Sequence, residues 1–112
     1  MKVLVIIPAY NEAGNLPRLL KELNQYQDRY DAIVVDDASS DRTAQVAKSY
    51  SVPVIRLAAN LGIGGAVQAG FKYAVQNGYD IAVQVDGDGQ HDPAWIDALL
   101  KPIVAESMDC VI

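Results

Sequence analysis

The sequence of 112 residues has one cysteine, one histidine and no apolar run long enough to cross a membrane. The single cysteine, Cys110, excludes a disulfide within the chain, and its apolar neighbours favour a small buried core residue. The apolar run Val3–Ile7 near the N-terminus is far too short for a signal peptide. We therefore expect a soluble protein of a reducing compartment.

Basic residues are scarce as well. Nine Lys and Arg stand against 14 Asp and Glu, and the net charge is −5. The nine cations are scattered along the chain, which excludes the basic patch of a nucleic-acid-binding surface. With 51% hydrophobic and 21% charged residues, the composition is that of a globular domain. Residues 1–112 form at most one domain, large enough for a core but small for a complete enzyme.

Short apolar runs rich in β-branched residues alternate with segments of helical periodicity. The continuous apolar runs favour parallel strands that are covered on both faces. The β-α-β-α-β-α-β-α-β order predicts a three-layer α/β/α sandwich with a mainly parallel sheet and right-handed crossovers. The expected strands are Lys2–Ile7, Asp31–Val35, Val52–Leu57, Asp80–Val85 and Asp109–Ile112, and the expected helices run over Leu16–Leu23, Asp41–Tyr50, from the Gly62–Gly65 loop to about Asn77, and over Pro93–Lys101.

Single residues mark the expected ends of these elements. Pro8 is expected to stop the first strand, because it has no N–H. Asn15 and Ser40 are expected as N-caps of the first and second helices. Gly78 is expected to stop the third helix at its C-terminus.

Polar, mostly acidic residues follow three of the expected strands. Tyr10 and Glu12 follow the first strand, Asp36-Asp37 the second, and Asp86-Gly87-Asp88 the fourth. In a doubly wound sheet, ligands bind outside the carboxyl ends of the strands, at the point where the strand order reverses. The sequence therefore predicts a binding site at that edge.

The stretch Val83–Pro93, with the sequence VQVDGDGQHDP, gathers three aspartates within seven residues. In an extended backbone Asp86 and Asp88 share a face. Two neighbouring carboxylates repel each other unless a proton or a cation lies between them. Because hard oxygen ligands suit Mg²⁺ or Mn²⁺, we interpret the stretch as a divalent-metal site.

Two other interpretations of this stretch are open. Asp-Gly pairs form turns, and Asp92-Pro93 is a good helix start, so Asp92 is better explained as an N-cap than as a metal ligand. An EF-hand calcium loop would place His91 where glycine belongs and Asp97 where glutamate belongs. A turn alone does not explain the acids at the other strand ends.

A glycine-rich segment, Gly62-Ile63-Gly64-Gly65, leads into the third expected helix. Such a segment lets a ligand approach the backbone, and the amides at a helix start favour anions. It is not the dinucleotide fingerprint, because Val67 stands where the third glycine belongs, and it has no Gly-Lys-Ser/Thr of a Walker A loop. A tight turn with small residues for helix–sheet packing explains it equally well.

A crevice lined by so many acids would repel a phosphate unless a metal intervened. With a metal on Asp88 the crevice could bind a diphosphate, while Asp37 accepts hydrogen bonds from the N–H groups of a nucleobase and Tyr10 supplies a flat face. Acids around a central metal suit a nucleoside diphosphate. The acidic lining comprises Glu12, Asp36, Asp37, Asp86 and Asp88.

Four segments in order, IIPAYNEAGNL, VVDDASSDRT, NLGIGGAVQAG and VQVDGDGQHDP, resemble the donor half of the family 2 inverting nucleotide-sugar glycosyltransferases of the GT-A fold. The resemblance covers essentially the whole chain and is closest to the dolichyl- or polyprenyl-phosphate sugar synthases. It implies a Rossmann-like domain that is truncated after its N-terminal, donor-binding half.

The resemblance also implies roles for single residues. Asp86-Gly87-Asp88 matches the DxD motif of the family, with Asp86 facing the ribose or the metal and Asp88 as the main metal ligand. Gln90 matches a further metal contact of the polyprenyl-phosphate branch, whereas His91 receives no chemical role. The nucleoside and diphosphate pocket would comprise Pro8, Tyr10, Glu12, Asp36, Asp37, Gly62, Gly64 and Asp86, with Asp37 at the base and the glycines near the ribose and diphosphate.

The implied reaction transfers a sugar from a UDP- or GDP-sugar to a polyprenyl phosphate or a glycan. Mg²⁺ or Mn²⁺ would stabilise the negative charge that builds on the departing diphosphate. A hydroxyl acceptor needs a general base, whereas a phosphate acceptor is already ionised. The base is expected beyond Ile112, so no catalytic residue is assigned and the chain alone is expected to be inactive.

The resemblance further implies a role in cell-wall or polysaccharide biosynthesis. We expect a cytoplasmic protein, with the full-length form at the inner face of the membrane. The truncated edge of the sheet predicts self-association, because an unpaired strand edge and a missing cover expose groups that favour contacts with other molecules.

Three alternative functions are open. Sugar-nucleotide pyrophosphorylases share a related architecture but rely on a basic glycine-rich loop after the first strand, where this chain has Glu12. Receiver-type signalling modules also gather acids around Mg²⁺ but need an acceptor Asp after the third strand, which here runs into Arg56-Leu57-Ala58. A non-catalytic nucleotide-binding fragment is the third. The identity of the nucleobase is also open, because an Asp accepts hydrogen bonds from the N–H edge of uracil or of guanine.

Overall fold

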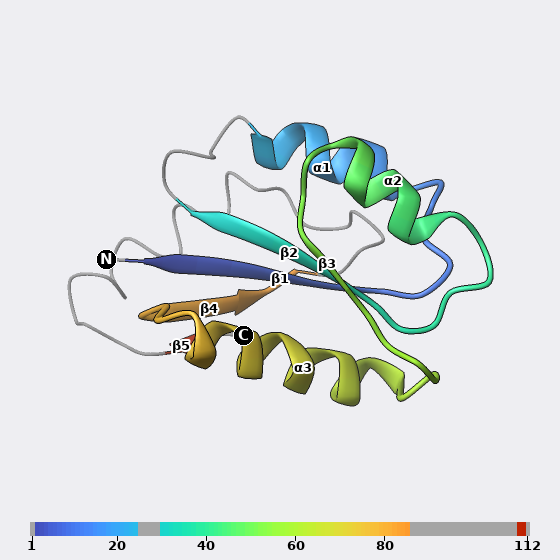
Figure 1. Cartoon of the computed structure of the whole chain (residues 1–112). Helices are drawn as coiled ribbons and strands as arrows, with labels where there is room; N and C mark the ends of the chain where they lie inside the picture. Colours follow the sequence, from blue (N-terminus) through green and yellow to red (C-terminus); the bar gives the residue numbers. More distant parts are fainter. Residues whose placement is uncertain (1, 25–29, 86–109, 112) are drawn as a thin grey trace.

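The computed structural model describes residues 2–24, 30–85 and 110–111. Its strands form one sheet in the order β3-β2-β1-β4-β5, and each described strand pair is parallel. Helices α1 and α2 cover one face of the sheet and α3 covers the other (Figure 1), so the predicted three-layer α/β/α sandwich is confirmed. The elements are β1 (Val3–Ala9), α1 (Leu16–Asn24), β2 (Asp31–Asp36), α2 (Thr43–Ser49), β3 (Val54–Arg56), α3 (Gly62–Gln76), β4 (Ile81–Gln84) and β5 (Cys110–Val111).

The first strand, β1, lies in the middle of the sheet and is buried along its whole length. Alternate side chains of a strand point to opposite faces. Accordingly, Val5 and Ile7 belong to the hydrophobic core under α1, whereas Leu4 and Ile6 belong to the core under α3. Burial on both faces explains why this segment is a continuous apolar run rather than an alternating one.

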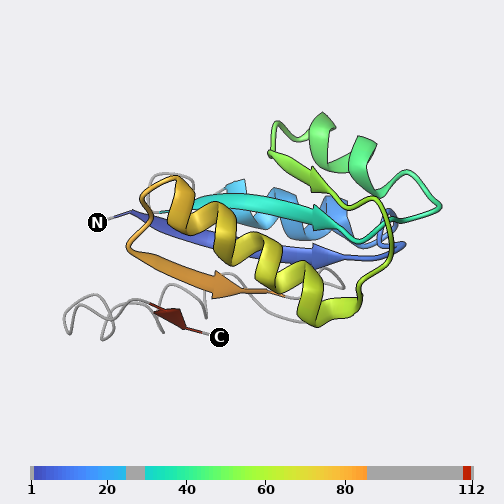
Figure 2. The ribbon, with the colours of Figure 1, turned by 60° about the horizontal axis from the view of Figure 1, so that its bottom comes forward.

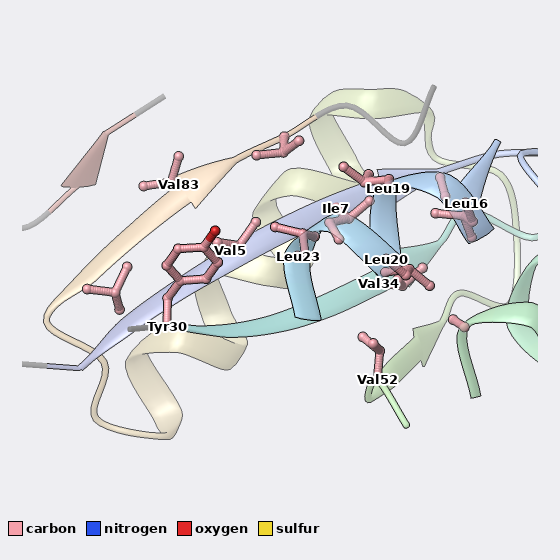
Figure 3. Close-up of a cluster of buried hydrophobic side chains, with 14 of the residues drawn as sticks. Val5, Ile7, Leu16, Leu19, Leu20, Leu23, Tyr30, Val34, Val52 and Val83 are labelled. Atoms are coloured by element: carbon pink, nitrogen blue, oxygen red, sulfur yellow. The ribbon is translucent and has the colours of Figure 1, made fainter. Parts of the chain in front are cut away.

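Helix α1 turns one apolar stripe toward the sheet. Four leucines at helical spacing are buried there and lie beside Val5, Ile7 and Val34 (Figure 3). Fully burying a leucine stabilises the fold by about 1.5–3 kcal/mol relative to leaving it exposed, so this contact holds α1 on its face of the sheet. The four are Leu16, Leu19, Leu20 and Leu23.

Helix α3 runs along the opposite face of the sheet, as Figure 2 shows, and contacts it through small residues. Ala66, Gly70 and Ala74 are the buried residues of this helix. A Cβ added to Gly70 would lie 2.4 Å from Cγ2 of Ile6, so only glycine permits this approach. Gly78 follows the helix with φ of +72°, which confirms it as the expected C-terminal stop.

Pro8 does not end β1, contrary to the prediction. The strand continues through Pro8 and Ala9, which pair in register with Val35 and Asp36 of β2. The Ala9 carbonyl accepts the Asp37 N–H from the β2 side, so the neighbouring Pro8 faces the β4 side. The described pairing with β4 stops before it, and the missing N–H therefore breaks no hydrogen bond of that ladder.

The start of α2 also differs from the prediction. The helix begins at Thr43 rather than Asp41, and Ser40 does not cap it. The Ser40 N–H and hydroxyl both donate to the side chain of Asn11 instead. The Asp41 carboxylate accepts the Thr43 N–H at 3.0 Å, so the residue after the expected cap holds the first helical N–H.

The third strand is shorter than the predicted Val52–Leu57, because its register with β2 covers only Val54–Arg56. The helix predicted over Pro93–Lys101 lies outside the described residues. Of the helices in the described part of the chain, none has the length and hydropathy to span a membrane.

Candidate functional site

The carboxyl edge of the sheet is where β1 and β2 run into their loops and where α3 begins. In the described residues, apart from the buried hydroxyl of Tyr30, the buried polar and charged side chains lie between the end of β2 and the start of α2. Burying polar groups is unfavourable unless they are hydrogen-bonded, so such a concentration indicates a built polar site rather than packing alone. These residues are Asp36, Asp37, Ser39 and Thr43.

The strand order reverses between β1 and β4, which is the point where doubly wound sheets bind ligands. At this edge the Val85 N–H donates to the Ile6 carbonyl at 2.9 Å, which is the last hydrogen bond between β1 and the β4 segment in the described residues. The observed topology thus has its switch point beside β1, and ligand binding at this edge stays a prediction.

Asp36 closes the turn after β2. Its Oδ1 accepts the Ser39 N–H at 3.0 Å, and its Oδ2 lies 3.8 Å from Nε of Arg56. Asp36 is 1% exposed, whereas the Arg56 side chain is 62% exposed. The carboxylate thus joins its own turn to the end of β3, and a contact of Asp36 with a nucleotide stays a prediction.

Asp37 joins β2 to the start of α3. Its Oδ1 accepts the Leu61 N–H at 2.7 Å and its Oδ2 accepts the Gly62 N–H at 2.9 Å. Leu61 is the N-cap residue of α3, where N–H groups have no partner within the helix. Helix α3 has no acidic residue in its own first turn, so Asp37 supplies the negative charge that stabilises a helix N-terminus. Each oxygen has a further lone pair, and the predicted base contact stays a prediction.

The loop after β1 places Tyr10 and Glu12 next to this edge. Pro8 is buried within β1, Tyr10 is 50% exposed, and Glu12 is half-buried. The Glu12 carbonyl accepts the N–H groups of Asn15 and Leu16 at 3.0 and 2.9 Å, and its carboxylate accepts from the Asn15 amide at 2.8 Å. The loop therefore leads directly into α1 and leaves the Tyr10 ring available for a ligand.

Asn11 ties the β1–α1 loop to the β2–α2 loop, a contact that sequence reasoning missed. Its side-chain Oδ1 accepts the Ser40 N–H at 2.9 Å, the Ser40 hydroxyl at 3.2 Å and the Asp41 N–H at 3.3 Å. Its own N–H donates to the Ser39 hydroxyl at 2.9 Å. The partners lie about 30 positions apart along the chain, so no local spacing pattern reveals them.

Two more backbone groups of the β1–α1 loop bind the β2–α2 loop. The Glu12 N–H donates to the Thr43 hydroxyl at 3.0 Å, and the Ala13 N–H donates to the Asp41 carboxylate at 3.2 Å. Desolvation raises the pKa of Asp41, but hydrogen bonds from Thr43 and Ala13 outweigh it and hold that pKa below its usual value. We call the hydrogen bonds between residues 11–13 and 39–43 the loop lock.

The two predicted glycines of the pocket begin α3. Gly62 has φ of +79°, a conformation that favours glycine, and a Cβ added to Gly64 would meet no atom within 4 Å. Open space therefore lies beside the first turn of α3. Because the Gly62 N–H already donates to Asp37, an anion at this helix start would bind the later amides.

The predicted metal ligands Asp86, Asp88 and Gln90 lie outside the described residues. Within residues 2–24, 30–85 and 110–111, no group of three or more His, Cys, Asp or Glu side chains could hold a metal ion. The described residues therefore supply the polar walls of the site but do not form a metal centre by themselves.

Ala38 is strained within this edge, because it has φ of +59° without being a glycine. A left-handed conformation costs an L-residue about 1–2 kcal/mol, and glycine avoids that cost. We expect Ala38→Gly to raise the free energy of unfolding by up to about 1 kcal/mol. Urea denaturation measures this change, and a destabilised variant would contradict the strained conformation.

The sequence model of the family described as "Glycosyl transferase family 2" matches residues 4–112. The undecaprenyl-phosphate mannosyltransferase of Micrococcus luteus is 41% identical over 108 residues, which cover 92% of this chain and 44% of that protein. The chain thus spans less than half the length of this relative.

Two solved structures resemble the fold. The mannosyltransferase PcManGT from Pyrobaculum calidifontis, in complex with GDP-Man and Mn²⁺, gives a TM-score of 0.69 at 26% identity over 77% of this chain and 27% of that chain. TarS 1-349 from S. aureus, in complex with UDP, gives a TM-score of 0.72 at 26% identity over 91% of this chain and 32% of that chain.

Proposed function

Because the chain belongs to glycosyl transferase family 2, we propose that its carboxyl edge forms the donor side of a site for a UDP- or GDP-sugar. The expected GT-A fold is confirmed by the parallel sheet and by the likeness to PcManGT and TarS. The observation that carries the proposal is the gathering of buried Asp36 and Asp37, the exposed Tyr10 ring and the open start of α3 at one edge.

The described residues would divide the work of holding the nucleotide. The half-exposed ring of Tyr10 offers a flat apolar face for the base. Asp37 offers the remaining lone pairs of a carboxylate whose position is fixed by two backbone N–H groups. The space beside Gly64 lets the ribose and diphosphate approach the first turn of α3, where backbone amides favour an anion.

The metal belongs to the same proposal. PcManGT was solved with Mn²⁺, and Asp86, Asp88 and Gln90 are the proposed metal contacts of this chain. Carboxylate and amide oxygens suit Mg²⁺ as well as Mn²⁺. When bound, the ion would stabilise the negative charge on the departing diphosphate. Tyr10, Asp37 and the first turn of α3 would position the nucleotide and exclude water from it.

For the acceptor we propose a polyprenyl phosphate rather than a glycan, since the similar protein of Micrococcus luteus is an undecaprenyl-phosphate mannosyltransferase. A phosphate acceptor is already ionised and needs no general base, and no catalytic residue is assigned in this chain. Such an acceptor favours a cytoplasmic enzyme at the inner face of the membrane, active in cell-wall or polysaccharide biosynthesis. Residues 1–112 would then be the donor-binding part of the enzyme, and self-association through the sheet edge stays a prediction.

A transfer assay on the intact protein tests this function. The protein is incubated with Mn²⁺, undecaprenyl phosphate and radiolabelled GDP-mannose or a UDP-sugar, and the lipid fraction is counted. A labelled lipid phosphate sugar, formed with one donor and absent when Mn²⁺ is chelated, supports the proposal. Binding of the nucleotide without any transfer to lipid or glycan would favour the non-catalytic alternative.

A further inference from the structure

We propose that Asn11 is a positioning residue, which sets the width of the nucleoside pocket by holding the β1–α1 loop against the β2–α2 loop. The inference rests on the proposed function, because it assumes that the nucleoside binds between these two loops. Tyr10 and Glu12 flank Asn11 on the first loop, and Asp37 begins the second loop. The separation of the Tyr10 ring from the Asp37 carboxylate therefore depends on the hydrogen bond between Asp37 and Ala9 and on the contacts that join the two loops beyond it.

The backbone ladder between β1 and β2 ends at Asp37, at the floor of the proposed pocket. Its last hydrogen bond runs from the Asp37 N–H to the Ala9 carbonyl at 2.9 Å. Beyond that point the segment after β1 leads to α1 and the segment after β2 leads to α2. The loop lock is the next connection between them, and Asn11 contributes four of its hydrogen bonds.

The backbone of Asn11 suits this role. Its φ of +53° is left-handed, a conformation that asparagine tolerates better than most residues with a side chain. In that conformation the amide oxygen reaches two successive backbone N–H groups of the turn after β2, those of Ser40 and Asp41. One short side chain thus accepts hydrogen bonds from two backbone N–H groups of the turn that follows Asp37.

We expect the loop lock to affect the width of the pocket more than the stability of the fold. Asn11, Ser40 and Asp41 are exposed, so water replaces their hydrogen bonds when the side chain is removed. The buried leucines of α1 and the fully buried β1 hold the layers together without them. Removing the Asn11 amide should therefore leave the protein folded and widen the gap between Tyr10 and Asp37.

The variant Asn11→Gly separates the side chain from the backbone, because glycine keeps the left-handed φ and loses only the amide. Ser51→Gly is the matched control. Ser51 has φ of +61° and lies between α2 and β3, away from the loop lock. Both are measured in the intact protein by calorimetric titration with UDP and GDP in Mn²⁺, by amide hydrogen exchange and by thermal unfolding.

We expect Asn11→Gly to weaken nucleotide binding about tenfold and to speed exchange at Ser40 and Asp41, with an unfolding midpoint close to that of the wild type. Ser51→Gly should bind like the wild type. Equal affinity of Asn11→Gly and the wild type would overturn the positioning role while leaving the proposed function intact. A wild-type protein that binds neither nucleotide would instead overturn the proposed function, and the role of Asn11 with it.

Discussion

Asp37→Ala is expected to lower the free energy of unfolding by about 2 kcal/mol and to abolish nucleotide binding. The substitution removes the carboxylate that accepts the Leu61 and Gly62 N–H groups. The Gly62 N–H then keeps only the Asn60 side-chain oxygen at 3.2 Å, and the Leu61 N–H loses its carboxylate acceptor. It also removes the negative charge that faces the N-terminus of α3, a helix without an acid in its own first turn. Without the Asp37 carboxylate, we expect the glycine-rich start of α3 to move away from the carboxyl edge of the sheet.

Asp80→Ala is the matched control for this prediction. Asp80 is also an aspartate that accepts a backbone N–H, that of Lys2 at 2.7 Å, but it is exposed and lies before β4 at the opposite edge of the sheet. We expect less than about 1 kcal/mol of destabilisation and unchanged nucleotide binding, since water replaces an exposed hydrogen bond. Urea denaturation and calorimetric titration of both variants make the comparison. Equal losses in the two would contradict a special role for Asp37.

Gly70→Ala is expected to lower the free energy of unfolding by about 2 kcal/mol through overpacking. The new Cβ would lie 2.4 Å from Cγ2 and 3.1 Å from Cδ1 of Ile6. Ile6 is fully buried in the central strand β1, and a β-branched side chain in a close-packed core has few alternative rotamers. The layer formed by α3 must therefore move away from the sheet.

Gly64→Ala in the same helix serves as the control. Its new Cβ would meet no atom within 4 Å, and alanine favours helix by up to about 1 kcal/mol over glycine. Urea denaturation should therefore show a less stable Gly70→Ala and an equally or more stable Gly64→Ala. If Gly70→Ala were neutral, the close contact of α3 with β1 would be wrong.

The layers of the fold could be predicted from the sequence because they follow from patterns of apolar residues. The continuous apolar run of β1 indicated a strand covered on both faces, and the leucines at helical spacing marked the buried stripe of α1. Pro8 was misread for a reason outside any pattern. Whether a proline ends a strand depends on which side its missing N–H would face, and that side is set by the neighbouring strands.

The site was predicted in part, for a similar reason. Residues that follow neighbouring parallel strands must meet at one edge, so the position of Asp36 and Asp37 beside the Glu12 loop followed from topology alone. Their partners did not follow, because the Asp37 carboxylate binds backbone groups more than 20 residues away. Asn11 was missed because a left-handed φ and hydrogen-bond partners far along the chain leave no trace in local spacing.

The central claim is that the carboxyl edge, completed by Asp88, binds a nucleoside diphosphate through a metal. Calorimetric titration of the intact protein with UDP and with GDP, each with and without Mn²⁺, tests it most directly. The matched variants are Asp88→Asn, at the proposed metal ligand, and Asp92→Asn, at the expected N-cap, where asparagine also caps well. We predict that one nucleotide binds only with Mn²⁺, and that Asp88→Asn loses this binding whereas Asp92→Asn keeps it. Metal-independent binding, or binding retained by Asp88→Asn, would contradict the account.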